Sequence, residues 1–393
     1  MLFLYNISIG LYRILILLAS PFYPKAKQLI QGRNQTLANF SIEDGIIWVH
    51  CSSLGEYEQA VPVLKEIKAL KDNRKVLLTF SSPSGYINKK DNFIGDFICY
   101  LPIDTLSKMR EFVAKVKPQK VLLIKYEFWP NMLLALNEKN IPVYSICSVF
   151  RKNHFLFKEY GKWNLKIIAK SITHFFVQDQ HSKENLKANN ISNVSVVGDS
   201  RFDRVLDIAQ NKKHINLIEE FRGDKKLIVC GSTWPKDVEL ILDLSKNNPK
   251  LKIIIAPHEM SHLNKINVGL RYSKATQDNI SQHNILIIDS IGLLSSLYQY
   301  GDIAYIGGGF NNGIHNTLEA ISYGIPVVFG PKYKKFVEAV SLTEQGLAKS
   351  VNNREQLQKA FSDFTEKPLA KDIKSFCQQN SGASHKIMKF IFS

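Results

Sequence analysis

Cysteine is scarce in this chain, and its spacing shows no pairs. The 393 residues include five cysteines, an odd number spread from Cys51 to Cys377. This wide separation argues against a disulfide-stapled scaffold or a zinc knuckle and favours a reducing cytosolic setting. The composition is 45% hydrophobic and 22% charged, which excludes disordered, collagen-like and low-complexity chains and suits about two domains.

Two common nucleotide-binding motifs are also missing. No G-x-x-x-x-G-K phosphate loop occurs in the sequence. The dinucleotide pattern G-x-G-x-x-G fails because Asn312 stands at its third glycine position after Gly307 and Gly309. The sequence therefore argues against a P-loop enzyme and against a nicotinamide dehydrogenase.

Acidic residues are in the minority. The 35 acids face 51 Lys and Arg residues, which gives a formal net charge of +16. Such a balance favours nucleic acid, anionic lipid or phosphorylated substrates, and the charge alone does not choose among them.

The N-terminal segment is apolar and carries no acid before residue 43. On a helix, Asn6, Arg13 and Ser20 share one face of residues 2–22, and aliphatic side chains form the opposite face. This pattern favours a helix lying in the membrane interface, with a true span or a buried structural helix as alternatives. A cleaved signal peptide fits poorly, because Arg13 interrupts the apolar stretch.

Short apolar runs alternate with helical stretches after residue 45, which predicts parallel sheets covered by helices. The expected strands are 46–51, 75–80, 121–126, 141–147, 174–178 and 194–198, then 227–231, 252–257, 285–289, 303–309 and 325–330. Because the series occurs twice, we expect two Rossmann-like, doubly wound α/β domains facing a central cleft. The expected divisions are a membrane-associating segment 1–40, an N-terminal domain 41–205, a linker 206–226, a C-terminal domain 227–353 and C-terminal helices 354–393.

Polar residues follow several of these strands. Glu56 lies at a helix start after H-C-S-S-L-G, where the helix dipole favours its ionised form, so its role is either to support the helix end or to do chemistry. Glu127 follows a strand among aromatic residues, which requires an ion pair or a function. Arg201 and Arg204 suit either anion recognition or a salt-bridge network.

The segment 303–320, I-A-Y-I-G-G-G-F-N-N-G-I-H-N-T-L-E-A, is the richest of these clusters. It predicts a strand, a glycine turn and a helix that starts near His315 and Asn316, which would form an anion site from free N–H groups. A tight turn is the plain alternative. His258 to His262 also match H-E-x-x-H, but the motif follows Pro257 at a strand end, and short motifs match by chance.

Taken in order, S-S-L-G-E, K-Y-E-F-W-P-N, G-D-S-R-F-D, G-S-T-W-P and G-I-H-N-T-L-E-A resemble the Kdo transferase family, which adds 3-deoxy-D-manno-octulosonic acid (Kdo) to lipid A precursor. The resemblance extends to about residue 347. It implies a GT-B type fold with an N-terminal membrane helix, the cytoplasmic face of the inner membrane, a CMP-Kdo donor, and neither a metal nor another cofactor.

By this resemblance, Glu56 is the general base, and Glu127 and Arg201 stabilise the transition state. Many relatives carry lysine at the Arg201 position and E-T-E-L-W-P where this chain has K-Y-E-F-W-P. Lys125 therefore replaces the first acid, and either Glu127 takes over its role or the role is lost. The residues expected to contact the nucleotide are Pro257, His258, Ile291, Gly292, Leu293, Asn316, Thr317, Leu318 and Glu319.

The resemblance implies an inverting, metal-independent transfer of Kdo from CMP-Kdo to lipid A precursor (lipid IVA) in lipopolysaccharide biosynthesis. Six basic residues interleaved with aromatic ones between 151 and 170 suit lipid phosphates and acyl chains, nucleic acid, or a plainly solvated face. Anionic lipid of the inner membrane is the expected further partner, and nucleic acid is not. The alternatives are a transferase of another nucleotide sugar and a non-catalytic, membrane-bound anion or nucleic-acid binder.

Overall fold

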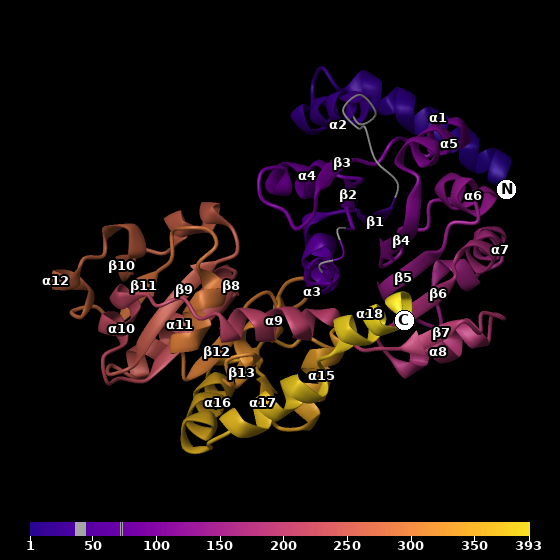
Figure 1. Cartoon of the computed structure of the whole chain (residues 1–393). Coiled ribbons are helices and arrows are strands. Elements are labelled where there is room, and N and C mark those ends of the chain that lie inside the picture. The colour runs from indigo at the N-terminus through magenta and orange to yellow at the C-terminus, as the bar shows by residue number, and fades with distance from the viewer. Residues whose placement is uncertain (36–44, 71, 73) are drawn as a thin grey trace. The chain divides into compact units, whose positions relative to one another are not determined.

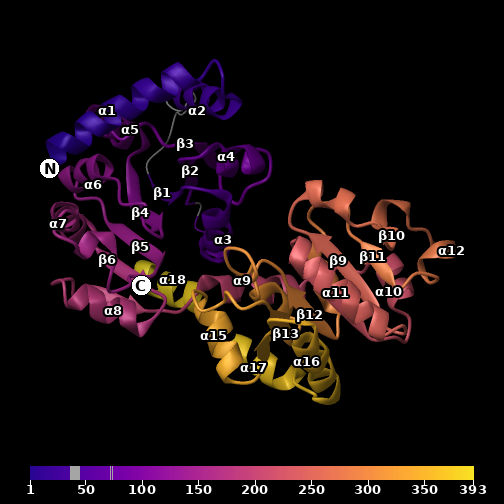
Figure 2. The ribbon, with the colours of Figure 1, turned by 180° about the vertical axis from the view of Figure 1, so that it is seen from behind.

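Two compact units make up the computed structural model, which describes residues 1–35, 45–70, 72 and 74–393 (Figures 1 and 2). The first unit is Met1–Arg204 with Ser381–Ser393, and the second is Val205–Asn380. Each unit contains an all-parallel seven-stranded sheet. The predicted α/β fold with two doubly wound sheets is therefore confirmed, while the expected boundary at residues 40 and 41 lies outside the described residues.

The elements of the first unit, in chain order, are α1 (Leu2–Ala19), α2 (Pro24–Gln35), β1 (Ile46–Cys51), α3 (Leu54–Ala69), β2 (Val76–Phe80), α4 (Pro83–Lys89), β3 (Phe97–Tyr100), α5 (Leu106–Val116), β4 (Pro118–Ile124), α6 (Pro130–Glu138), β5 (Val143–Ser148), η1 (Phe155–Phe157), α7 (Lys162–Ser171), β6 (His174–Val177), α8 (Gln180–Lys187), β7 (Val194–Val196), the start of α9 (Ser200–Gln210) and, from the C-terminus, α18 (Ala383–Phe392). Its strand order is β3-β2-β1-β4-β5-β6-β7.

The second unit contains, after the end of α9, α10 (Asn216–Arg222), β8 (Leu227–Thr233), α11 (Pro235–Asn247), β9 (Lys252–Pro257), η2 (Met260–Lys265), β10 (Leu270–Arg271), η3 (Tyr272–Lys274), α12 (Gln277–Ile280), β11 (Ile285–Ile287), α13 (Leu294–Leu297), η4 (Tyr298–Tyr300), β12 (Ile303–Ile306), α14 (Leu318–Ile321), β13 (Val327–Phe329), α15 (Val337–Glu344), β14 (Ala348–Ser350), α16 (Arg354–Glu366) and α17 (Ala370–Gln379). Its strand order is β10-β11-β9-β8-β12-β13-β14.

The strands that the sequence pattern did not predict lie at sheet edges. β3 is an edge strand of the first sheet, and β10 and β14 are the two edges of the second. Edge strands are short and partly uncovered, so they lack the continuous apolar run of a buried parallel strand. β14 reads Ala-Lys-Ser, which carries no such signal.

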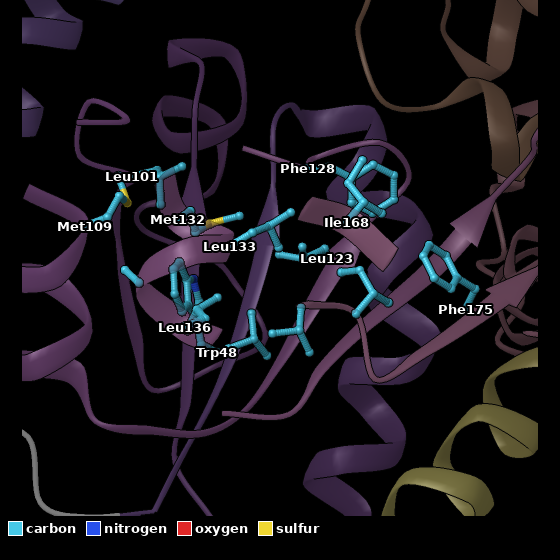
Figure 3. Close-up of a cluster of buried hydrophobic side chains, with 14 of the residues drawn as sticks. Trp48, Leu101, Met109, Leu123, Phe128, Met132, Leu133, Leu136, Ile168 and Phe175 are labelled. Carbon is cyan, nitrogen blue, oxygen red and sulfur yellow. The ribbon is translucent and has the colours of Figure 1, made fainter. Parts of the chain in front are cut away.

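Strand alternation divides the core of the first unit between the two faces of its sheet. On β1, Ile46 and Trp48 pack into one buried cluster, while Ile47 and Val49 pack into another. Figure 3 shows the first cluster, in which Trp48 and Leu123 lie with side chains from α5, α6 and α7. Because successive side chains of a strand point to opposite faces, a sheet covered on both sides buries every residue of a central strand, as in I-I-W-V-H-C.

The C-terminal helix returns to the first unit. Ile387 and Met388 of α18 pack in the same cluster as Tyr57 and Leu64 of α3. The Asp203 carboxylate in α9 accepts hydrogen bonds from the N–H of Ser384 at 2.8 Å and from its hydroxyl at 2.7 Å. The cap and the apolar face together fix α18 against α3.

The N-terminal helix α1 exposes its apolar face. Ile9 is the one residue of α1 that is buried, whereas Leu4, Leu15 and Leu18 are each more than half exposed. The alternative of a buried structural helix is therefore wrong. On the opposite face, the Asn6 side chain accepts a hydrogen bond from Asn131 at the start of α6, at 2.8 Å. Within the described residues, α1 is the one helix long and apolar enough to cross a membrane.

Candidate active site

The topology of the first sheet places two predicted site residues, Glu56 and Glu127, at the same edge of the sheet. β1 and β4 are neighbours in the sheet, although the chain visits β2 and β3 between them, so the strand order reverses there. In open parallel sheets, ligands bind beyond the carboxyl ends of strands at such a switch point. Glu56 follows β1 directly and Glu127 follows β4. Strand order alone therefore brings these two carboxylates to the same edge.

Glu56 lies in the first turn of α3 and closes the turn that precedes it. Its carboxylate accepts a hydrogen bond from the backbone N–H of Ser52, so the helix-end role considered from the sequence is present. Burial raises the pKa of Glu56, and the negative charge of Glu127 raises it further. Ser52, Lys125 and His50 oppose this shift without cancelling it. The expectation that Glu56 favours its ionised form is thus corrected: burial and the charge of Glu127 outweigh the Ser52 hydrogen bond and the charges of Lys125 and His50.

Glu127 has the opposite behaviour. Burial alone would raise its pKa, but hydrogen bonds and the charge of His50, together with hydrogen bonds from Trp129 and Ser52, lower the pKa below its ordinary value. Its Oε2 lies 3.1 Å from His50 Nε2 and 2.7 Å from Trp129 Nε1. The ion-pair alternative and the functional one are both compatible with this arrangement. Glu127 is held ionised beside a carboxylate that is easier to protonate.

His50 is a residue whose importance the sequence motif did not reveal. It is fully buried on β1, and its Nδ1 lies 2.7 Å from the Thr79 hydroxyl. That hydroxyl also accepts a hydrogen bond from Trp48 Nε1 at 2.7 Å. Nδ1 of His50 also lies 3.2 Å from the Thr79 carbonyl, and its Nε2 faces the Glu127 carboxylate. The imidazole therefore positions Glu127.

Three cations of the first unit, Lys125, Arg201 and Arg204, are held by local contacts. Lys125 adopts a positive φ of 57° directly after β4, its carbonyl accepts from the Ser148 hydroxyl at 2.8 Å, and its charge lowers the pKa of Glu56. Arg201 pairs with Asp199, with 2.6 Å between Nη2 and the carboxylate. Arg204 pairs with Glu58 of α3. The salt-bridge network that the sequence left open is thus present, and the transition-state role of Arg201 stays a prediction.

The second unit has its own switch point between β8 and β12. The residues that follow β8, β9 and β12 include Trp234, His258 and His315, and their rings form one stack. His258 and His315 have centroids 4.1 Å apart, and His258 and Trp234 have centroids 5.1 Å apart. Trp234 Nε1 donates to His315 Nε2 at 3.1 Å. An indole N–H can only donate, so the proton of a neutral His315 ring sits at Nδ1.

His315 is a neutral donor at physiological pH. Burial lowers its pKa to about 4, with a further contribution from His258. The ring can therefore present its Nδ1–H to an anion without the cost of carrying a buried charge.

The glycine turn of 307–313 differs from its prediction. The predicted helix start at His315 and Asn316 is wrong, because α14 begins at Leu318 and spans one turn. The N–H groups of Gly307, Gly308 and His315 bond to protein acceptors instead of staying free. The turn is closely packed: a Cβ on Gly309 would lie 2.6 Å from the backbone of Gly330. The plain alternative, glycines needed for a tight turn, accounts for these contacts.

Asp237 ties this turn to the neighbouring strand, and sequence reasoning missed it. The carboxylate is fully buried and accepts from the N–H groups of Trp234 at 2.9 Å and Gly308 at 3.0 Å. It also accepts from the Tyr305 hydroxyl at 2.8 Å. A capping-box aspartate three residues after Trp234 at a helix start was the available signal.

The predicted nucleotide contacts lie in three segments, one at the end of β9 and the others after β11 and β12, and these strands are at or near the switch point of the second sheet. Ile291 is 89% exposed, and Gly292 has a positive φ of 92°. Asn316 donates to Glu319 at 2.9 Å. Thr317 and Leu318 are fully buried, backbone included, so neither presents an exposed atom to a ligand in this structure.

The H-E-x-x-H motif does not form a helical pair. It continues into the 3₁₀ helix η2, and His258 stacks on other rings, while His262 Nε2 lies 3.8 Å from Glu259. Among the described residues, no group of three or more His, Cys, Asp or Glu is arranged to hold a metal ion.

The comparisons with known proteins agree with this geometry. The family model described as 3-deoxy-D-manno-octulosonic-acid transferase (kdotransferase) matches residues 23–204. A 3-deoxy-D-manno-octulosonic acid transferase of Aquifex aeolicus is 29% identical over 326 residues, covering 80% of this chain and 84% of that protein. A bifunctional glycosyltransferase/methyltransferase of Fusobacterium nucleatum is 28% identical over 98% of this chain, which spans 63% of that protein.

Among solved structures, the UDP-GlcNAc 2-epimerase of Neisseria meningitidis has a TM-score of 0.62 and 21% identity, covering 88% of this chain and 99% of that one. This likeness shows the fold. Two doubly wound sheets with polar residues at both switch points, together with these relatives, define a glycosyltransferase of the GT-B type. The chain is thus similar to the Kdo transferase family, by the family model over residues 23–204 and by curated Kdo transferases over most of its length.

Proposed function

We propose that this chain transfers Kdo from CMP-Kdo to lipid IVA, with inversion and without a metal, in lipopolysaccharide biosynthesis. Glu56 takes the proton from the attacking hydroxyl of the acceptor. The bond from the Kdo anomeric carbon to the CMP phosphate breaks as the bond to the acceptor oxygen forms, and CMP leaves with the electron pair.

The observation that carries the proposal is that the pKa values of two carboxyl groups at the same sheet edge shift in opposite directions. The pKa of Glu56 is raised and the pKa of Glu127 is lowered. Environments that push two carboxyl pKa values apart assign separate roles to them. A base works best when its pKa lies close to the operating pH, so Glu56 suits proton transfer. Glu127 stays ionised and supplies a fixed negative charge where positive character develops on the sugar.

The second unit supplies the proposed nucleotide site. His315 offers a neutral Nδ1–H, and the segments around Ile291 to Leu293 and Asn316 to Glu319 surround the same edge of the sheet. We assign the CMP phosphate to the His315 side and the ribose hydroxyls to Glu319, whose carboxylate can accept from them. Pro257 is the last residue of β9, and His258 directly follows the strand.

The proposed place of action is the cytoplasmic face of the inner membrane. The exposed side chains of α1 form an apolar face that suits the acyl boundary of a bilayer. Lys152, Lys158 and Lys166 are exposed on the segment 151–170, with Phe155 and Tyr160 beside them. Trp163 of this segment lies 5.9 Å from the Tyr5 ring of α1, so the two surfaces adjoin and together suit an anionic lipid layer.

The direct test is incubation of the purified full chain with lipid IVA and CMP-Kdo in the presence of a chelator. We expect a Kdo-bearing lipid and free CMP at the rate seen without chelator. Product that forms only after zinc is added would overturn the metal-free mechanism. A matched incubation with UDP sugars, and a comparison of CMP with UDP binding, tests the alternative donor. Tighter binding of UDP would favour a transferase of another nucleotide sugar.

A further inference from the structure

A cavity of about 410 Å³ lies beside the N-terminal helices of the first unit. Residues of α1 and α2 form one side, and the segment from Pro102 into α5 forms the other. Figure 1 shows where these helices lie in the first unit. Its described lining residues are Arg13, Ile16, Leu17, Ile30, Arg33, Pro102, Ile103, Lys108 and Glu111. None of them is a residue assigned above to the transferase site.

The charged part of this cavity is basic. Arg13, Arg33 and Lys108 line it, and Glu111 is the acid among the described lining residues. Lys108 Nζ lies 2.9 Å from Glu111, and both of these side chains are about half exposed at the surface of α5. The two guanidinium groups therefore leave the cavity with an excess of positive charge.

Arg33 is the most enclosed of these groups. Its Nε atom is buried and has no hydrogen-bond partner among the described residues. Burial lowers the pKa of Arg33, while Tyr12 and Tyr100 oppose that effect. A buried guanidinium N–H without an acceptor is costly, and a bound anion would satisfy it.

The other walls are apolar and continue into an exposed apolar surface. Ile16, Leu17 and Ile30 line the cavity from the two N-terminal helices. Leu17 is also 47% exposed, and Leu18 next to it is 67% exposed. The ligand that such a cavity accepts carries an anionic head joined to a hydrocarbon chain.

We propose that this cavity binds one anionic glycerophospholipid of the bilayer, with its phosphate between Arg33 and Arg13 and an acyl chain along Ile16, Leu17 and Ile30. The volume suits one headgroup and the start of a chain, at the lower end of ligand pockets, and does not suit an acylated disaccharide. The bound lipid would hold α1 and α2 against α5 while the outer face of α1 lies in the membrane. This inference rests on the proposed membrane attachment only because the bilayer supplies the lipid.

The test is native mass spectrometry of the full chain in detergent after incubation with phosphatidylglycerol. We expect one phosphatidylglycerol per chain, and about tenfold weaker retention of zwitterionic phosphatidylcholine. Arg33→Gln should weaken phosphatidylglycerol retention about tenfold. Lys27→Gln is the matched control, because Lys27 is an exposed cation on the same helix that does not line the cavity. It should change retention less than twofold.

A second variant separates binding from folding. Ile103→Trp fills the cavity and leaves every charge in place, so it should also lose the lipid at an unchanged thermal midpoint. Equal losses for Arg33→Gln and Lys27→Gln, or retention in Ile103→Trp, would overturn the site. Preferential retention of lipid IVA over phosphatidylglycerol would overturn the choice of lipid. Vesicle flotation and transferase assays report the membrane attachment and the proposed function separately.

Discussion

The two switch points of this chain have the same topology and different chemistry. At the first, between β1 and β4, the side chains beyond the sheet are ionisable: Glu56, Glu127 and Lys125, with His50 below them. At the second, between β8 and β12, they are stacked rings and glycine backbone, and the His315 imidazole is neutral. The contrast matches a division of labour in which the charged edge moves a proton and the neutral edge holds a ligand.

Loss of the base should have the largest effect. Glu56→Gln keeps the shape and removes the proton acceptor, so turnover of lipid IVA should fall by about 10²- to 10⁴-fold. CMP binding, measured by calorimetry, should stay within twofold, because the proposed nucleotide contacts lie in the second unit. Glu66→Gln in the same helix is the control and should keep full turnover. A Glu56→Gln protein that turns over lipid IVA as fast as the parent would overturn the assignment of Glu56 as the base.

Backbone packing is expected to matter at the second switch point and not at the first. Gly309→Ala places a Cβ 2.6 Å from the backbone of Gly330 and should destabilise the protein by about 3 kcal/mol. Gly55→Ala meets nothing within 4 Å at the start of α3 and should stabilise by about 0.5 kcal/mol. Thermal unfolding measures both changes. Equal effects of the two substitutions would remove the distinction.

The pH dependence of turnover tests the coupling of the two carboxyl groups. Glu127→Gln removes the charge that raises the pKa of Glu56. A lower pKa keeps the base ionised in more acidic solution, so the acid limb of kcat/KM should move to lower pH. We expect about tenfold lower turnover at the optimum as well, because a fixed charge near the sugar is lost. An acid limb that does not move would show that the charge of Glu127 does not influence the pKa of Glu56.

His50→Gln should move the same limb in the opposite direction. The charge of His50 lowers the pKa of Glu56, and the hydrogen bond and charge of His50 lower the pKa of Glu127. Without the imidazole both pKa values rise, so the acid limb should move to higher pH while CMP binding is unchanged. A purely structural His50 would lower the thermal midpoint and leave the limb in place.

The sequence predicted much of the first switch point and less of the second. Glu56 and Glu127 follow apolar strands directly, so strand order alone brings them together. His50 is hidden because a histidine inside I-I-W-V-H-C looks like part of a buried strand, and its partner Thr79 is 29 residues away. In the glycine turn, the sequence pattern predicted the start of a helix with free N–H groups. Asp237 and the strand carbonyls occupy several of those groups through contacts that no local pattern reveals.

The smallest expected effect concerns the neutral ring of the second switch point. His258 contributes to the low pKa of His315, and burial is the larger cause. His258→Asn should therefore raise the pKa of His315, which nonetheless stays below its ordinary value of 6.5 because the burial remains. The midpoint of the His315 ring signals in an NMR titration measures this shift directly. A His315 that titrates at its ordinary value in the parent protein would mean that the second switch point, like the first, carries charge, and the contrast between the two edges would disappear.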